Sequence, residues 1–179
     1  MKKKIAIILN ILIITLGLLG VGIAFKQHMT KDFLLYYTNL SNLYAIIASL
    51  IYLLTINKDY KIGKILRYSS TICLMLTLLV VVLILTPILK ENLFIGNYMP
   101  LYHLIIPTLS LVSLLFFEEK EPNIKSALIP TLIYGFIMII LNIFKVIEGP
   151  YPFLKVYKQG FLMSIIWIIV IFAINYLNI

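Results

Sequence analysis

The chain has 179 residues, of which 62% are hydrophobic and 12% are charged, and its formal net charge is +8. Soluble domains contain roughly 45–50% apolar residues, so this composition excludes an ordinary water-soluble protein and predicts one integral membrane domain. The positive charge does not favour nucleic acid as a partner, because the basic residues lie in short ties between long apolar runs, as membrane orientation requires.

Six stretches of the chain are long and apolar enough to cross a membrane, which takes roughly 17–25 residues. In chain order we expect spans at residues 5–25, 33–56, 68–89, 101–117, 127–147 and 161–178. The ties between them are short, which predicts an all-α bundle of six transmembrane helices with antiparallel neighbours. The first apolar run is longer than that of a signal peptide, so we interpret it as a retained span.

The basic residues predict how these spans are oriented. With a cytoplasmic N-terminus, nine lysine and arginine residues lie on the cytoplasmic side and six lie on the other side. Cytoplasmic loops are enriched in such residues, so both termini are expected in the cytoplasm. All but one of the 15 basic residues are lysine, which is typical of an AT-rich bacterial source and hence indicates a bacterial plasma membrane.

The second span opens with a polar cluster, YYTNLSNLY, at residues 36–44. Thr38, Ser41 and Asn42 are spaced i, i+3 and i+4 and therefore share one helix face. Such groups can simply bond a carbonyl one turn earlier or a neighbouring helix, or their face can do chemistry inside the bundle. Because we expect this span to begin at residue 33, Thr38 should lie beyond most of the free N–H groups of the helix start.

His103 lies near the start of the fourth span, which enters from the same membrane face as the second. Thr38 and His103 are therefore expected at similar depth. An ionisable residue inside a span is costly and suggests function, although a single histidine can also be a packing group. The other histidine, His28, lacks metal-ligand spacing from His103, and Cys73 is the single cysteine, so we expect neither a metal nor a cofactor.

The tie after the fifth span, EGPYPFLKVYK, combines prolines with aromatic residues. We expect it to be stiff and extended, without helix through Pro150 and Pro152. Tyr151 fits an aromatic belt at the membrane surface or a substrate contact. Lys145 either extends its ammonium group to the interface or holds the carboxylate of an amphiphile.

These stretches together resemble the androgen-induced protein family, which includes the androgen-dependent regulator of tissue factor pathway inhibitor. FLLYYTNLSNLY resembles the T-x-x-S-N signature of that family, and YHLIIP resembles its H-x-x-x-P motif. IPTLIYGFIMIILNIFKVIEGPYPFL resembles its P-x-x-Y helix followed by Y-P-F-L. The resemblance covers nearly the whole chain, with departures at Ser110, Ser113 and Lys155.

The resemblance implies a membrane-embedded threonine hydrolase that cleaves fatty acid esters of hydroxy fatty acids. By motif position, Thr38 would be the nucleophile and His103 its base. Residues expected to contact the substrate or its oxyanion are Ser41, Asn42, Lys145 and Tyr151, with Lys31 and His28 as further candidates for the product carboxylate. Asp32 and Glu148 are the nearby acids that could complete a triad.

Two other classes remain open. The Thr38–His103 cleft could bind or transport a lipid or small molecule without chemistry, or the polar groups could join the helices of a non-catalytic assembly subunit. The expected partners are a lipid or fatty acyl ester and the bilayer, with no nucleic acid and no metal.

Overall fold

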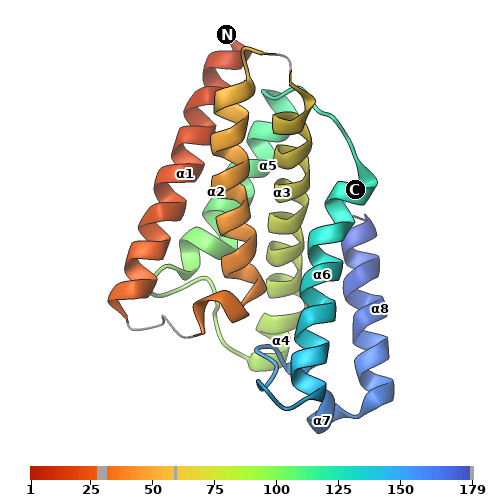
Figure 1. Ribbon diagram of the computed structural model, residues 1–179. Coiled ribbons are helices and arrows are strands. Elements are labelled where there is room, and N and C mark those ends of the chain that lie inside the picture. The colour runs from red at the N-terminus through yellow and green to blue at the C-terminus, as the bar shows by residue number, and fades with distance from the viewer. Residues whose placement is uncertain (28–31, 59, 178–179) are drawn as a thin grey trace.

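A computed structural model describes residues 1–27, 32–58 and 60–177, and these ranges contain helices and no strand (Figure 1). The prediction of an all-α fold is therefore confirmed. The longer helices are α1 (Lys2–Lys26), α2 (Tyr37–Thr55), α3 (Lys61–Val80), α5 (Ile106–Phe116), α6 (Ile124–Ile143) and α8 (Phe161–Leu177). The short ones are η1 (Phe33–Leu35), η2 (Val81–Leu85), α4 (Thr86–Leu89), η3 (Leu101–Ile105), η4 (Pro152–Leu154) and α7 (Val156–Gln159).

Four helical stretches are long and apolar enough to cross a membrane. They are Lys2–Lys26, Tyr37–Thr55, Lys61–Leu89 and Ile124–Ile143. The two other apolar helices, Leu101–Phe116 and Leu162–Leu177, are shorter. A helix of about 16 residues covers about 24 Å, less than the ~30 Å of a bilayer core. Length and composition thus support four of the six predicted spans directly.

Two helix starts differ from the prediction. Tyr36 has an extended backbone (φ −87°, ψ 125°), so α2 begins at Tyr37 and not at residue 33. Conversely, α3 begins at Lys61 and not at residue 68, because the stretch KIGKILR has no proline to stop a helix. Thr38 is therefore the second residue of α2, and Arg67 lies inside α3 and not in a tie.

The segment after α6 contains more helix than the prolines suggested. Pro152 begins the 3-10 turn η4, and α7 follows at Val156. The expectation of an extended segment fails at Pro152, because the missing N–H of a proline is harmless in the first turn of a helix.

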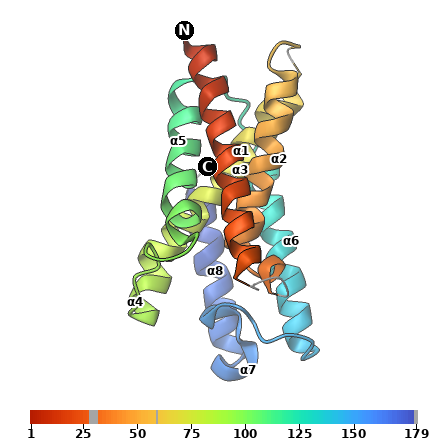
Figure 2. The same ribbon diagram turned by 90° about the vertical axis from the view of Figure 1, so that its left-hand side faces the viewer.

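The apolar helices alternate in direction, and α3 lies at their centre. It contacts α2, α5, α6 and α8, and α5 also contacts α1 (Figures 1 and 2). In Figure 1, α1 descends from the N-terminus and α8 ascends toward the C-terminus. Helices α6 and α8 form a pair on one side of α3.

Two prolines widen the helices just before them. The π-helical turn η2 precedes Pro87, and the π-helical turn η3 precedes Pro107. A proline has no N–H to donate and its ring crowds the carbonyl four residues earlier, so the preceding turn widens. For Pro107 that carbonyl belongs to His103, which explains why the H-x-x-x-P motif places its histidine in a π-helical turn.

Tyr102 anchors η3 against α1. Its hydroxyl donates to the Gly17 carbonyl at 2.9 Å. Gly20 leaves room for the ring, because a Cβ there would lie 2.2 Å from Tyr102 Cε1. His103 is the next residue of the same turn.

Candidate functional site

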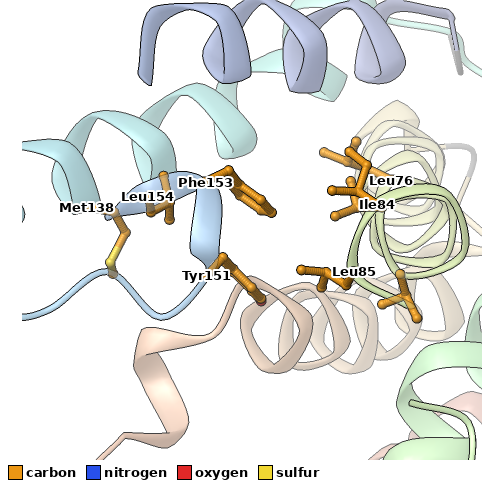
Figure 3. Close-up of a cluster of buried hydrophobic side chains, with 9 residues drawn as sticks. Leu76, Ile84, Leu85, Met138, Tyr151, Phe153 and Leu154 are labelled. Carbon is orange, nitrogen blue, oxygen red and sulfur yellow. The ribbon is translucent and has the colours of Figure 1, made fainter. Parts of the chain in front are cut away.

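An apolar cavity of about 260 Å³ lies between α3, α6, α8 and the segment that contains η4. Figure 3 shows Tyr151 and Phe153 pointing toward Leu76 and Leu85, and all four residues line this cavity. The lining also carries six hydroxyl side chains, which we call the hydroxyl cluster: Tyr37, Thr38, Thr77, Thr131, Tyr134 and Tyr151. A mostly apolar cavity with a few convergent polar groups is the usual form of a ligand site.

Thr38 and Tyr151 meet at this cavity. The backbone N–H of Thr38 donates to the Tyr151 hydroxyl at 3.3 Å, and the two hydroxyl oxygens are 3.5 Å apart. The expectation that Thr38 lies beyond most of the free N–H groups is wrong, because α2 starts at Tyr37 and the N–H groups of its first residues have no carbonyl partner within the helix. Since the Tyr151 oxygen accepts this bond, its own hydrogen stays available for Thr38 or a ligand.

Ser41 and Asn42 hold the backbone of Thr38. Ser41 Oγ and Asn42 Nδ2 donate to the Thr38 carbonyl at 3.0 and 2.8 Å. Asn42 Nδ2 also donates to the Tyr102 carbonyl at 3.2 Å, which occupies both of its hydrogens. These contacts make the two residues positioning groups in this structure, and their role toward an oxyanion stays a prediction.

The Asn42 bridge brings the start of α2 next to η3, as the matched depth of Thr38 and His103 requires. His103 is buried, and its Nδ1 lies 2.6 Å from the Leu93 carbonyl. A carbonyl can only accept, so Nδ1 carries the hydrogen and Nε2 of the neutral ring presents a lone pair. The Leu93 carbonyl thus fixes the tautomer and the orientation of this ring.

Thr38 and His103 share no hydrogen bond within residues 1–27, 32–58 and 60–177. His103 is also not among the residues that line the cavity of the hydroxyl cluster. Their pairing as nucleophile and base stays a prediction.

Lys145 lies away from Thr38, in a second cavity of about 210 Å³. Its Nζ is 5.1 Å from the centre of the Tyr157 ring. Glu148 lines the same cavity and contacts Lys155 at 3.5 Å and also Lys158. The hydrogen bond from Lys158 and the charge of Lys155 lower the pKa of Glu148. The other predicted carboxylate ligands, Lys31 and His28, fall outside the described residues.

Tyr151 is suited to act as a neutral donor. It is buried against Phe153, with the two rings stacked at 5.1 Å. Burial raises the pKa of Tyr151 to about 12. The hydroxyl therefore keeps its proton throughout the physiological range.

Sequence reasoning missed four members of the hydroxyl cluster. Tyr37 and Thr131 form a hydrogen bond of 2.7 Å, Thr77 is 3.0 Å from Ser41, and the Tyr134 hydroxyl donates to the Leu35 carbonyl at 2.7 Å. The available signal was weak, because single hydroxyl residues in apolar spans usually bond their own helix.

A second polar cluster lies at the opposite end of α3. Arg67 and Glu118 pair at 3.1 Å, with 0% and 1% of their side chains exposed. Asn10 and Ser113 donate to the same Glu118 oxygen at 2.8 and 2.6 Å. Ser110 accepts from Arg67 at 3.1 Å, so Ser110 and Ser113 both contact this pair. The sequence does not predict this pair, because Arg67 falls in a tie outside the predicted spans.

Comparison with known proteins found no family model, no curated protein and no solved structure that matches this chain.

Proposed function

We propose that the protein is a membrane-embedded lipid ester hydrolase that acts through an acyl-threonine intermediate, as its resemblance to the androgen-induced protein family implies. The substrate class is a fatty acid ester of a hydroxy fatty acid. The observation that carries this proposal is the contact of Thr38 with the Tyr151 hydroxyl at a mostly apolar cavity. An apolar cavity suits an acyl chain, and the two hydroxyl groups suit its ester bond.

The proposed reaction starts with attack of Thr38 Oγ1 on the ester carbonyl carbon. His103 Nε2 takes the proton of Thr38, and the Tyr151 hydroxyl donates to the oxyanion that forms. Collapse breaks the bond to the alcohol oxygen, which takes the proton back from His103. Water, activated by the same histidine, then hydrolyses the acyl-threonine and restores the Thr38 hydroxyl.

The membrane setting of this proposal is a six-span bundle with both termini in the cytoplasm. The four membrane-length helices support it, and so do the two shorter apolar helices that alternate with them in direction. The positive-inside bias of the sequence supplies the orientation. We place the protein in a bacterial plasma membrane because all but one of its 15 basic residues are lysine, which is typical of an AT-rich bacterial source.

A fluorophosphonate probe tests the proposal, because it labels activated hydroxyl nucleophiles. We expect labelling of the wild-type protein and its loss in Thr38→Ala and His103→Ala. Thr15→Ala is the matched control, since the Thr15 hydroxyl is tied to the Ile11 carbonyl at 2.9 Å on α1. Labelling that persists in Thr38→Ala would overturn the assignment of the nucleophile.

The second candidate is a lipid-binding or transport protein without chemistry. The hydrogen bonds of the described residues favour it: His103 bonds the Leu93 carbonyl and Thr38 contacts Tyr151, and a hydroxyl without a base is not a strong nucleophile. This candidate expects lipid binding by the wild type together with no probe labelling and no ester hydrolysis. If the protein is a hydrolase, probe labelling and ester hydrolysis should both depend on Thr38.

A further inference from the structure

We infer that the acyl chain of the substrate reaches Thr38 sideways, through an apolar mouth between α6 and α8, and that Gly135 keeps this passage open. The inference rests on the proposed hydrolase function and adds the route and the residue that selects for chain length. It has three supports: the exposure of the mouth, the open space at Gly135 and the position of Trp167.

The mouth consists of residues that line the cavity and also face the outside of the bundle. Leu132 and Phe136 of α6 are 48% and 67% exposed, and Ile168 and Phe172 of α8 are 44% and 36% exposed. All four side chains are apolar. A water-soluble ligand would gain nothing at such an opening, whereas an acyl chain in a bilayer passes from one apolar environment to another.

The hydroxyl cluster lies inward from this mouth. Thr131 is on α6 one turn before Gly135, and it bonds Tyr37, the neighbour of Thr38. A separation of four residues is about 6 Å along a helix, and both residues line the cavity. Gly135 thus stands close to the path between the mouth and Thr38.

Gly135 leaves free space where a side chain would be. A Cβ at this position would meet no atom within 4 Å, so a larger residue can be accommodated without a backbone clash. Such a residue would extend into the passage and would obstruct a long acyl chain more than an acetyl group. Gly22 on α1 is a matched control, because its Cβ would also meet nothing within 4 Å and it does not line the cavity.

The cavity contains its own reporter. Trp167 is the single tryptophan of the chain and lines the cavity from α8. It also contacts Phe153, with the ring centres 5.9 Å apart. Bromine atoms on a bound acyl chain quench tryptophan fluorescence at short range, so quenching of Trp167 measures occupancy independently of hydrolysis.

The binding experiment uses the full-length protein in detergent and a palmitoyl ester brominated at mid-chain. We expect wild type and Gly22→Leu to be quenched alike. Gly135→Leu should need about tenfold more ester for half-maximal quenching, as misfit of one or more methylene groups in an apolar site typically requires. Equal quenching curves for Gly135→Leu and Gly22→Leu would overturn the inference.

A measurement on the wild type keeps the inference testable if Gly135→Leu does not fold. Trp167 lies on α8, whereas Thr38 lies on α2, so mid-chain bromines should quench more strongly than bromines beside the ester group. Equal quenching from both positions, or stronger quenching from the ester end, would contradict the proposed route.

Hydrolysis assays separate this inference from the proposed function. We expect Gly135→Leu to lower kcat/KM for a palmitoyl ester at least about tenfold more than for an acetyl ester. If hydrolysis depends on Thr38 but Gly135→Leu slows it equally for both esters, the proposed route is wrong and the hydrolase function stands. Normal quenching without hydrolysis in the wild type would remove the hydrolase and leave a lipid site between α6 and α8.

Discussion

At the scale of single residues, the position of Thr38 in its helix frees its hydroxyl group. Thr71 and Thr77 lie inside α3 and donate to the carbonyls of Arg67 and Cys73, four residues earlier. Thr38 is the second residue of α2, and the carbonyl four residues earlier belongs to η1, which the extended Tyr36 separates from α2. Its hydroxyl therefore remains for Tyr151 or a substrate, while Ser41 and Asn42 hold its carbonyl. A hydroxyl left free in this way is what a nucleophile requires.

Tyr151→Phe tests the proposed oxyanion donor. We expect kcat for a fatty ester to fall about 10²–10³-fold with little change in KM, because the donor acts on charge that develops only in the transition state. Tyr157→Phe is the control, since its hydroxyl donates to the Ile143 carbonyl in the same part of the chain. A loss of less than about threefold in Tyr151→Phe would rule out this role.

The profile of kcat/KM against pH should fall only on the acid side. His103 must be neutral to act as base, and an ordinary histidine has a pKa of about 6.5, so the acid limb of kcat/KM should lie at or below that pH. Burial raises the pKa of Tyr151 to about 12, so this donor stays protonated and the profile should stay level from about pH 8 to 10. A short neutral ester is the substrate of choice. A profile without an acid limb would exclude His103 as the base.

At the scale of helices, close contacts at the helix starts position the two predicted catalytic residues. The Tyr151 hydroxyl caps α2, and Tyr102 fixes η3 against α1 through Gly17 and Gly20. The π-helical turn before Pro107 then orients His103 toward Leu93. The site depends on these few contacts, because helix propensity alone would not bring α2 and η3 together.

Gly20→Ala should strain the contact between α1 and η3. The new methyl group would meet the Tyr102 ring at 2.2 Å, so we expect a loss of about 1–3 kcal/mol in the free energy of unfolding. Gly22→Ala adds the same methyl group to open space and should leave stability equal or higher. Reversible unfolding in mixed micelles measures both. Equal stability of the two variants would argue against a tight contact at Tyr102.

Removing one partner of the buried Arg67–Glu118 pair should destabilise the fold strongly, whereas replacing both partners with apolar residues should destabilise it much less. Glu118→Leu leaves an uncompensated guanidinium group in the bundle, so we expect a loss of about 3–5 kcal/mol in the free energy of unfolding. Adding Arg67→Met should restore much of it. The exposed carboxylate of Glu119, 2.6 Å from Lys64, is the control, and Glu119→Gln should cost less than about 1 kcal/mol. A double variant no more stable than Glu118→Leu would contradict this account.

At the scale of the whole molecule, the two halves of the bundle contribute different parts of the site. Helices α2 and η3 carry Thr38 and His103, whereas α6, α8 and the segment between them carry the apolar cavity wall and Tyr151. α3 lies between the two groups and contacts both. The cavity therefore exists only when α6 and α8 dock on α3.

Single-cysteine labelling tests the predicted membrane topology. In a Cys73→Ser background, Lys58→Cys should react with a membrane-impermeant maleimide only after the cell is opened. Lys90→Cys should react in intact cells, because one more predicted span separates the two positions. The reversed pattern would place the N-terminus outside and would move the Thr38 end of the bundle to the cytoplasmic face.

The sequence by itself determined the helical class, the apolar stretches and the polar face of α2. Periodicity and composition decide these features, because a run of apolar residues and an i, i+3, i+4 spacing act within one helix. The same local signals placed Thr38, Ser41 and Asn42 together, and all three are buried.

Only the tertiary structure decided which groups meet. Tyr151 is 113 residues from Thr38, and Glu118 is 51 residues from Arg67, so no local pattern could pair them. Tyr151 also accepts from a free N–H in the first turn of α2, a contact that the tertiary structure alone provides. A helical period shows which face is polar, but the partner across that face depends on how α3, α6 and α8 pack.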